Sequence, residues 1–289
     1  MTVQLPRTAL ITGPTSGIGH AYVKHLAKEG WSLILVGRNV RRLNQIKQEI
    51  NGTFGTQVQC LVADLSVNAD ILRVEAYIQQ DHQLELLINN AGFGLAAYFI
   101  DLPIEDQLKM VDVHLISTIR FSQAVIPAMI KKGGGQIINV SSLGAFFNLP
   151  GSVMYNTTKA ALVTFSQTLQ REVMHTGVKI QVLCPGFTPT SFHRSINGEA
   201  EFLKAVPKFL WTPVDQVVHE SIKGIKTKKV VCIPGRINRL IYFMHNLPLI
   251  GTIMQHLIQK QRNAKSSEVY EAAWTYNYAR KWLKNYKSA

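Results

Sequence analysis

The chain has 289 residues, of which 46% are hydrophobic and 17% charged, and its formal net charge is +13 at pH 7. This balance suits a soluble globular protein with a large core, and the lack of repeats or biased tracts excludes a low-complexity chain. The cysteines are few, widely spaced and without metal-ligand spacing, which excludes a disulfide framework or zinc site and favours small core residues in a reducing, cytoplasmic compartment; they are Cys60, Cys184 and Cys232.

Apolar, β-branched runs alternate with longer amphipathic stretches along the first 235 residues. The apolar runs predict strands at 8–13, 32–38, 57–65, 84–92, 135–142, 179–186 and 228–235. Between them, helical patterns cover 20–30, 41–50, 105–131 and 154–173. The alternation predicts an α/β fold, a Rossmann-type doubly wound parallel sheet of about seven strands with helices on both faces. We expect one domain over 1–235 and a basic, mostly helical extension over 236–289.

A glycine-rich segment, TGPTSGIG at 12–19, lies between the first predicted strand and the first helix. Glycines there permit a tight turn and a close approach of the backbone, and the following helix offers free N–H groups to a phosphate. The segment predicts a dinucleotide site, with an ordinary turn as the alternative. The predicted cofactor contacts in it are Gly13, Thr15, Ser16, Gly17, Ile18 and Gly19.

Arg38 ends the second predicted strand, where proteins that bind NAD usually carry an acidic residue for the ribose 2′-hydroxyl. A guanidinium suits a 2′-phosphate instead, which favours NADPH. The alternative is that Arg38 is a surface residue and the pocket does not discriminate.

Five segments occur in the order found in the short-chain dehydrogenase/reductase family, and the chain resembles that family over residues 8 to about 235. The segments are TGPTSGIG, ADL (63–65), NNAG (89–92), NVSS (139–142) followed by YNTTK (155–159), and PGFTPT (185–190).

The resemblance implies roles for individual residues. Ser142, Tyr155 and Lys159 match the family's catalytic serine, tyrosine and lysine. The family's cofactor contacts fall, in addition to Tyr155 and Lys159, on Asp64, Leu65, Asn90, Ala91, Gly92, Pro185, Gly186 and Thr188.

Tyr155 and Lys159 are four residues apart, so on a helix both side chains lie on one face about one turn apart. A phenol is normally too weak an acid to protonate a carbonyl oxygen near neutral pH, but a neighbouring ammonium lowers its pKa. The pair therefore predicts a general acid for carbonyl reduction, and a base for the reverse reaction. Ser142 would donate a hydrogen bond to the substrate oxygen.

His114 departs from the family pattern, which usually has an asparagine at this position that supports a water chain to the lysine. An imidazole can donate and accept hydrogen bonds, so His114 is a candidate member of such a relay. The alternative is that it only packs there.

The apolar segment between the last two predicted strands is expected to cover the substrate, together with aromatic residues near the catalytic motifs. This lining favours an apolar carbonyl compound. The alternative is that many of these side chains belong to the core; they are Phe93, Phe146, Phe147, Leu149, Met154, Phe187, Phe192, Phe202, Phe209, Leu210 and Trp211.

The basic charge is concentrated at the C-terminal end. Residues 223–289 hold 13 Lys or Arg and two acids, a net of +11, whereas residues 1–222 hold 18 and 16, a net of +2. The apolar run after Gly235 is interrupted too often for a membrane span. Three alternatives stay open for it: contact with an anionic membrane surface, packing on the domain, or packing on another subunit. Without a nucleic-acid motif, no nucleic-acid partner is expected.

Taken together, these features predict an NADPH-dependent carbonyl reductase, with a small-molecule carbonyl substrate and no metal. Two other interpretations remain, an NAD-dependent alcohol dehydrogenase of the same fold and a non-catalytic cofactor-sensing or scaffold protein. Family members commonly pair the helices flanking the fifth strand, so we expect a homo-oligomer, either dimer or tetramer. Residues 1–13 lack the apolar stretch of a secretory signal, which again favours the cytoplasm.

Overall fold

The computed structural model describes residues 7–81, 83–95, 97–148, 150–190 and 206–247. Within them, one seven-stranded sheet forms, in the order β3-β2-β1-β4-β5-β6-β7, and every pair of neighbours is parallel. This confirms the predicted Rossmann-type sheet. The strands are β1 (Thr8–Thr12), β2 (Ser32–Gly37), β3 (Val58–Val62), β4 (Leu84–Asn89), β5 (Gly135–Val140), β6 (Val178–Leu183) and β7 (Val231–Cys232).

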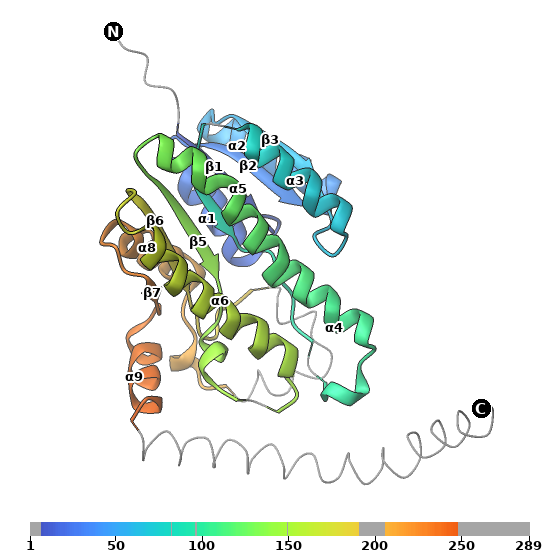
Figure 1. Cartoon of the computed structure of the whole chain (residues 1–289), viewed down its shortest axis with the longest axis vertical. Helices are drawn as coiled ribbons and strands as arrows, with labels where there is room; N and C mark the ends of the chain where they lie inside the picture. The colour runs from blue at the N-terminus through green and yellow to red at the C-terminus, as the bar shows by residue number, and fades with distance from the viewer. Residues whose placement is uncertain (1–6, 82, 96, 149, 191–205, 248–289) are drawn as a thin grey trace, which may run out of the picture.

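Helices cover both faces of the sheet (Figure 1). One apolar cluster joins the sheet to α1 (Gly17–Lys28), α2 (Val40–Phe54) and α8 (Val214–Lys226). A second cluster joins the other face to α3 (Asn68–Gln80), α5 (Ser117–Lys131) and α6 (Val153–Val173). The central strands β1, β2 and β4 are largely apolar because both of their faces are buried in these clusters, whereas the edge strand β3 has exposed residues.

Two of these helices, α3 and α8, were not among the predicted elements. The signal was present, because Ile71, Val74 and Ile78 follow helical spacing in α3 and are buried. Both helices are short and carry exposed charges between the apolar positions, so their helical periodicity is hard to recognise in the sequence.

The helix predicted at 105–131 is continuous but not uniform. It consists of α4 (Ile104–Val111), one turn of π-helix at Asp112–Ile116, and α5. By length and composition it could cross a membrane, yet half of its most apolar segment is buried within the protein. Phe121, Val125 and Met129 pack into the second core cluster, so we assign it as a core helix.

The chain continues after β7 into α9 (Arg236–His245), which packs on the domain beside a third cluster that includes Leu143 and Phe147. Cys184 and Cys232 are buried and Cys60 is partly buried, and all three are free, as expected of small core residues. The predicted helical structure beyond residue 247 and the predicted substrate contacts Leu149, Phe192 and Phe202 lie outside the described residues.

Candidate active site

The sequence motifs meet at one edge of the sheet. β1, β4, β5 and β6 are parallel and end at Thr12, Asn89, Val140 and Leu183, and the four motif segments follow directly. The carboxyl ends of parallel strands share an edge, which is where open α/β sheets bind their ligands. The fold therefore assembles the site from segments up to about 170 residues apart.

The glycine loop takes a left-handed backbone conformation that residues other than glycine rarely adopt. Gly13 and Gly17 have φ values of +65° and +55°. A Cβ on Gly19 would lie only 2.2 Å from the Gly13 carbonyl oxygen, and one on Gly13 would lie 2.9 Å from the Ala91 Cα. The loop is thus packed tightly against the NNAG segment, and it leads into the N-terminus of α1, whose first turn holds no acidic residue. This arrangement fits a dinucleotide pyrophosphate.

Thr12 holds the two motifs together, and the sequence reasoning missed it. Its Oγ1 accepts hydrogen bonds from the backbone N–H groups of Asn90 and Ala91, both at 2.9 Å. In return, Asn90 Nδ2 donates to the carbonyl oxygens of Thr12 and Gly13, both at 3.0 Å. The available signal was a buried hydroxyl residue directly before the glycine loop. The Asn90 side chain therefore holds the glycine loop in place through hydrogen bonds to two of its backbone carbonyl oxygens.

Arg38 lies at the end of β2 with 73% of its side chain exposed, and its Nη1 is 3.6 Å from Asp64 Oδ2. The Asp64 carboxylate also accepts bonds from Ser66 N and Oγ at 3.0 and 2.7 Å. Burial raises the pKa of Asp64, but the Ser66 bonds and the Arg38 charge outweigh it and hold the pKa below its usual value. Asp64 stays ionised and pairs with Arg38, whose guanidinium remains open to solvent.

The two neighbouring serines at the end of β5 differ in what their hydroxyls do. Ser141 is buried, and its Oγ donates to the Lys159 carbonyl oxygen at 2.7 Å. Ser142 is partly exposed, and its Oγ accepts from Gly144 N at 3.0 Å. A Cβ on Gly144 would lie 3.3 Å from Ser142 Oγ and 3.8 Å from the ring edge of Tyr155. Ser142, rather than Ser141, therefore faces the same space at Gly144 as the Tyr155 ring.

Lys159 lies below the Tyr155 ring, one turn along α6. Its Nζ is 5.8 Å from the ring centroid and donates a hydrogen bond of 2.8 Å to the Val140 carbonyl oxygen. Only 4% of the residue is exposed, and this burial lowers its pKa from 10.5 to about 8. Lys159 is thus a buried cation that remains mostly protonated near neutral pH, and its Nζ lies 5.8 Å from the ring centroid of the candidate acid.

His114 sits on the π-helical turn, and both of its ring nitrogens have protein partners. Nε2 accepts from the Phe93 N–H at 3.1 Å, and Nδ1 lies 2.9 Å from Thr158 Oγ1. Because Nε2 accepts, the proton of a neutral ring is on Nδ1 and is donated to Thr158, which itself donates to the Tyr155 carbonyl oxygen at 3.0 Å. Burial, and next the Lys159 charge, hold the pKa of His114 well below its usual 6.5.

The PGFTPT segment follows β6. The Pro185 carbonyl oxygen accepts from Leu143 N at 2.8 Å, which ties the segment to the residue after Ser142. Thr188 is 4% exposed, and its hydroxyl donates to the Gly186 carbonyl oxygen at 3.1 Å. The Thr188 oxygen keeps its acceptor capacity, which suits the N–H of a carboxamide.

Mostly apolar side chains line a small hollow beside Tyr155. A hollow of about 10 Å³ is lined by Tyr155 and eight neighbours, namely Leu95, Ala97, Phe99, Leu102, Gln107, Met110, Val153 and Met154. Of the other predicted substrate contacts, Phe147 is buried in the third core cluster, whereas Phe209 is 65% exposed. Phe187 and Trp211 pack together with ring centroids 5.6 Å apart.

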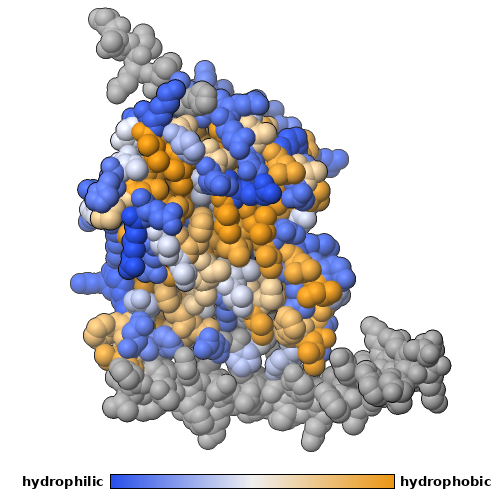
Figure 2. Space-filling view, viewed as in Figure 1, coloured by the Kyte–Doolittle hydropathy of each residue, from blue (hydrophilic) through white to orange (hydrophobic). Residues whose placement is uncertain are grey.

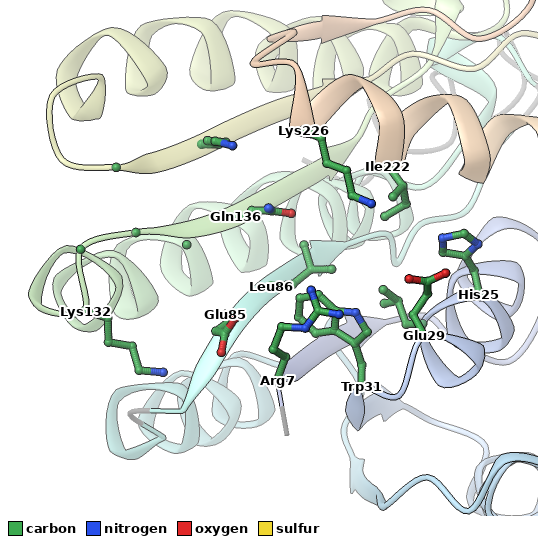
Figure 3. Close-up of a pocket in the computed structure, with 16 residues that line it drawn as sticks. Arg7, His25, Glu29, Trp31, Glu85, Leu86, Lys132, Gln136, Ile222 and Lys226 are labelled. Atoms are coloured by element: carbon green, nitrogen blue, oxygen red, sulfur yellow. The ribbon is translucent and has the colours of Figure 1, made fainter. Parts of the chain in front are cut away.

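A much larger cavity, about 550 Å³, lies at the opposite edge of the sheet, between the amino ends of the strands (Figure 3). Arg7, Glu85 and Lys226 are among its lining residues, and none of the predicted site residues is. We place the active site at the carboxyl edge, because the chemistry-bearing side chains converge there. Among the described residues, no group of three or more His, Cys, Asp or Glu is placed to hold a metal ion.

The sequence model of a family described as short chain dehydrogenase matches residues 7–201. The chain belongs to the short-chain dehydrogenase family. It is an oxidoreductase of that family, and its seven-stranded parallel sheet agrees with the fold that the resemblance predicted.

Individual relatives agree with this assignment. An uncharacterized oxidoreductase of Staphylococcus epidermidis is 34% identical over 201 residues, which covers 69% of this chain and 86% of that protein. Among solved structures, a short-chain dehydrogenase from Sphingobium yanoikuyae in complex with NADPH has a TM-score of 0.73 and 29% identity, covering 91% of this chain and 96% of that one. A bulky-bulky ketone specific alcohol dehydrogenase from Comamonas testosteroni has a TM-score of 0.71 and 26% identity, covering 91% and 94%.

Proposed function

We propose that this oxidoreductase reduces an apolar ketone or aldehyde to an alcohol with NADPH, using Tyr155 as the general acid. The observation that carries the proposal is the convergence of Tyr155, the buried Lys159 and Ser142 at the carboxyl edge of the sheet. The likeness to a ketone-specific alcohol dehydrogenase and to an NADPH complex supports the same reaction class.

The dinucleotide is proposed to lie along the carboxyl edge, with its pyrophosphate at Gly13–Gly19 and its adenosine end near Asp64, Leu65 and Arg38. The fit rests on the glycine loop, where an added Cβ would clash, and on a solvent-open guanidinium at the position that meets the ribose. The remaining proposed contacts are Thr15, Ser16, Ile18, Asn90, Ala91, Gly92, Tyr155, Lys159, Pro185, Gly186 and Thr188. When bound, NADPH supplies the hydride.

The chain's own residues supply the proton and its stabilisation. Tyr155 donates its phenolic proton to the carbonyl oxygen, and the Lys159 ammonium 5.8 Å from the ring centroid favours the phenolate that results. Ser142 Oγ donates a hydrogen bond to the same oxygen as negative charge develops on it. His114 acts as a positioning residue. Its hydrogen bonds to the Phe93 backbone and to Thr158 join the segment after β4 to the turn of α6 that carries Tyr155.

Several broader properties remain proposals. We propose one catalytic domain ending near residue 235, a cytoplasmic location, and a homo-oligomer formed through the helices that flank β5. Figure 2 shows a hydrophobic band along α5 and α4, where Leu108 is 51% and Ile130 41% exposed, and a partner subunit would bury this band.

The test is NADPH oxidation, followed at 340 nm against a panel of ketones and aldehydes, with Tyr155→Phe as the matched variant. We expect turnover by the wild type and a loss of at least a thousandfold in the variant, whose NADPH dissociation constant stays within about twofold. Turnover that survives in Tyr155→Phe contradicts the assignment of the acid. NADPH binding with no turnover of any panel member favours the cofactor-sensing alternative.

A further inference from the structure

The cavity at the amino edge of the sheet has the size of a small-molecule binding site. Its volume is about 550 Å³, within the range of roughly 300–1,000 Å³ that such sites occupy. The first residues of β4, β5 and β6 border it, together with the C-terminal ends of α1 and α8 (Figure 3). Among the described residues that line it, none is a proposed catalytic or cofactor residue, so a ligand bound there would be additional to the proposed NADPH and carbonyl substrate.

Two polar side chains line the sheet wall of this cavity. Leu86, Gln136 and Lys179 lie opposite one another in the register of β4, β5 and β6, so their side chains point to the same face of the sheet. On that face Gln181, two residues further along β6, is buried, and its amide forms hydrogen bonds to Ser221 through both its oxygen and its nitrogen. The Gln136 amide and the Lys179 ammonium have no hydrogen bond or ion pair within the described part of the chain, so their donors are free for a ligand.

The charged residues around the cavity are unequal in number and unpaired. Four cations face two carboxylates, a formal excess of two positive charges; they are Arg7, Lys132, Lys179 and Lys226, and Glu29 and Glu85. His25 adds no charge near neutral pH, because burial lowers its pKa. The ion pairs that the described residues form involve none of these six side chains. The positive excess is therefore available to an anion that enters the cavity.

Helix ends account for only part of this charge. Lys226 lies in the last turn of α8 and Lys132 is the C-cap of α5, where cations offset the partial negative charge of the terminal carbonyl groups. Arg7 precedes β1 and Lys179 lies within β6, so neither belongs to a helix. The Arg7 guanidinium lies 4.3 Å from the Trp31 ring centroid, across the cavity from Lys226 in Figure 3. This cation–π contact holds the guanidinium at the cavity wall, which lowers the entropy lost on binding an anion.

We propose that the amino-edge cavity binds a small organic dianion, either a phosphate monoester or a dicarboxylate. Cations around a partly enclosed space concentrate positive potential in it, and the planar Arg7 fork suits both phosphate and carboxylate oxygens. Because Glu29 and Glu85 reduce the excess to two charges, a dianion matches the cavity better than a polyphosphate does.

The rest of the lining suits the organic part of such a ligand. Trp31, Leu86 and Ile222 contribute apolar surface to the cavity, and the Gln136 amide can donate to a ligand oxygen or accept from a ligand hydroxyl. A few polar groups on a mostly apolar wall are what small-molecule sites use to orient a ligand. The proposal does not depend on the reductase function, because no residue of the proposed active site takes part in it.

The experiment is isothermal titration calorimetry of the full chain at pH 7.5 with phenyl phosphate, with glutarate, and with benzyl alcohol as the uncharged counterpart. We expect one dianion per chain with a dissociation constant below about 1 mM at low salt, weaker binding as salt is added, and no binding of benzyl alcohol. Tighter binding of phenyl phosphate or of glutarate identifies the preferred acid.

The test variant is Lys179→Gln with Lys226→Gln, which removes two of the lining cations. The matched control, Lys223→Gln with Lys47→Gln, makes the same change of charge at two exposed positions outside the cavity, one of them a turn earlier on α8. We expect the test variant to bind the dianion at least about tenfold more weakly, the loss of one or more charge-assisted hydrogen bonds, and the control to bind it like the wild type.

A wild type that binds neither dianion at millimolar concentration, or a test variant that binds like the control, overturns the proposal. So does benzyl alcohol that binds as tightly as phenyl phosphate. Binding that is lost in Arg38→Gln but kept in the test variant would place the anion at the cofactor edge, and this also overturns it. Tryptophan fluorescence gives a second readout: the dianion should change the emission of the wild type but not that of Trp31→Phe, and a change that persists in Trp31→Phe places the anion elsewhere.

Discussion

The buried His114 offers the sharpest test of the site geometry, through the change His114→Phe. Phenylalanine keeps most of the ring volume but has neither ring nitrogen. The Phe93 N–H then loses its partner in the interior, at a cost of about 1–3 kcal/mol, and loss of the Thr158 bond adds roughly 1 kcal/mol. For a domain of this size the melting temperature falls by about 2–4 °C per kcal/mol, so we expect a drop of roughly 5–15 °C.

The pH dependence of stability identifies the cause. In the folded protein the pKa of His114 is well below 6.5, so the ring stays neutral while the unfolded chain gains a proton below that pH. Wild-type stability should therefore fall as pH drops below about 6.5, by up to about 1.4 kcal/mol per pH unit from this group. His114→Phe should lack this component. The pKa values of His20 and His25 are also lowered, but both residues remain in the variant and cancel in the difference.

The assay is thermal unfolding by circular dichroism at several pH values between 5 and 7.5, with His175→Phe as a control at an exposed position. His114→Asn, which restores the residue usual in the family, should keep more activity than His114→Phe. An unchanged melting temperature together with an unchanged pH slope in His114→Phe would refute the hydrogen-bond assignment. A shifted pH–rate profile with intact stability would instead favour the relay role considered from the sequence.

Three further changes test other parts of the site. Lys159→Met should abolish turnover yet raise the free energy of unfolding at pH 7 by about 2 kcal/mol. The variant no longer buries a charge, which is the larger effect, but it loses the hydrogen bond to the Val140 carbonyl oxygen. The pKa of Lys159 is about 8 in the folded protein and 10.5 in the unfolded chain, so the stability gained by the variant should disappear between pH 8 and pH 10.5. Urea unfolding over this pH range measures the gain, and a variant less stable than the wild type at pH 7 contradicts the prediction. Arg38→Asp should raise the NADPH dissociation constant at least tenfold and lower that of NADH, measured by fluorescence titration; an unchanged ratio removes the argument for the phosphorylated cofactor. Gly19→Ala places a Cβ 2.2 Å from the Gly13 carbonyl oxygen and should abolish cofactor binding by calorimetry, whereas Gly52→Ala, with nothing within 4 Å, should bind normally.

The strands and most of the motif positions could be predicted from the sequence, because both depend on local order along the chain. A strand buried on both faces is largely apolar, so the central strands were visible as apolar runs in the sequence. The Tyr155–Lys159 pair follows from the helical repeat alone. The helices α3 and α8 were missed although their buried apolar residues follow helical spacing, because charged residues stand between these positions.

The tertiary structure decided which residues hold the motif segments in place. The roles of Thr12 and of Ser141 depend on partners 78 and 18 residues away, and no local pattern marks such contacts. The two ring partners of His114 come from two other segments, so its sequence position left relay and packing equally open.

The sequence by itself determined the fold class, the family and the pair of residues proposed for proton transfer, since these follow from periodicity and from motifs that are contiguous in the chain. Only the tertiary structure decided the lowered pKa of Lys159, the closed environment of His114 and the charged lining of the amino-edge cavity. The physical reason is that burial is a property of the packed chain: desolvation, which shifts those pKa values, and the walls of a cavity are set by neighbours that are distant in sequence.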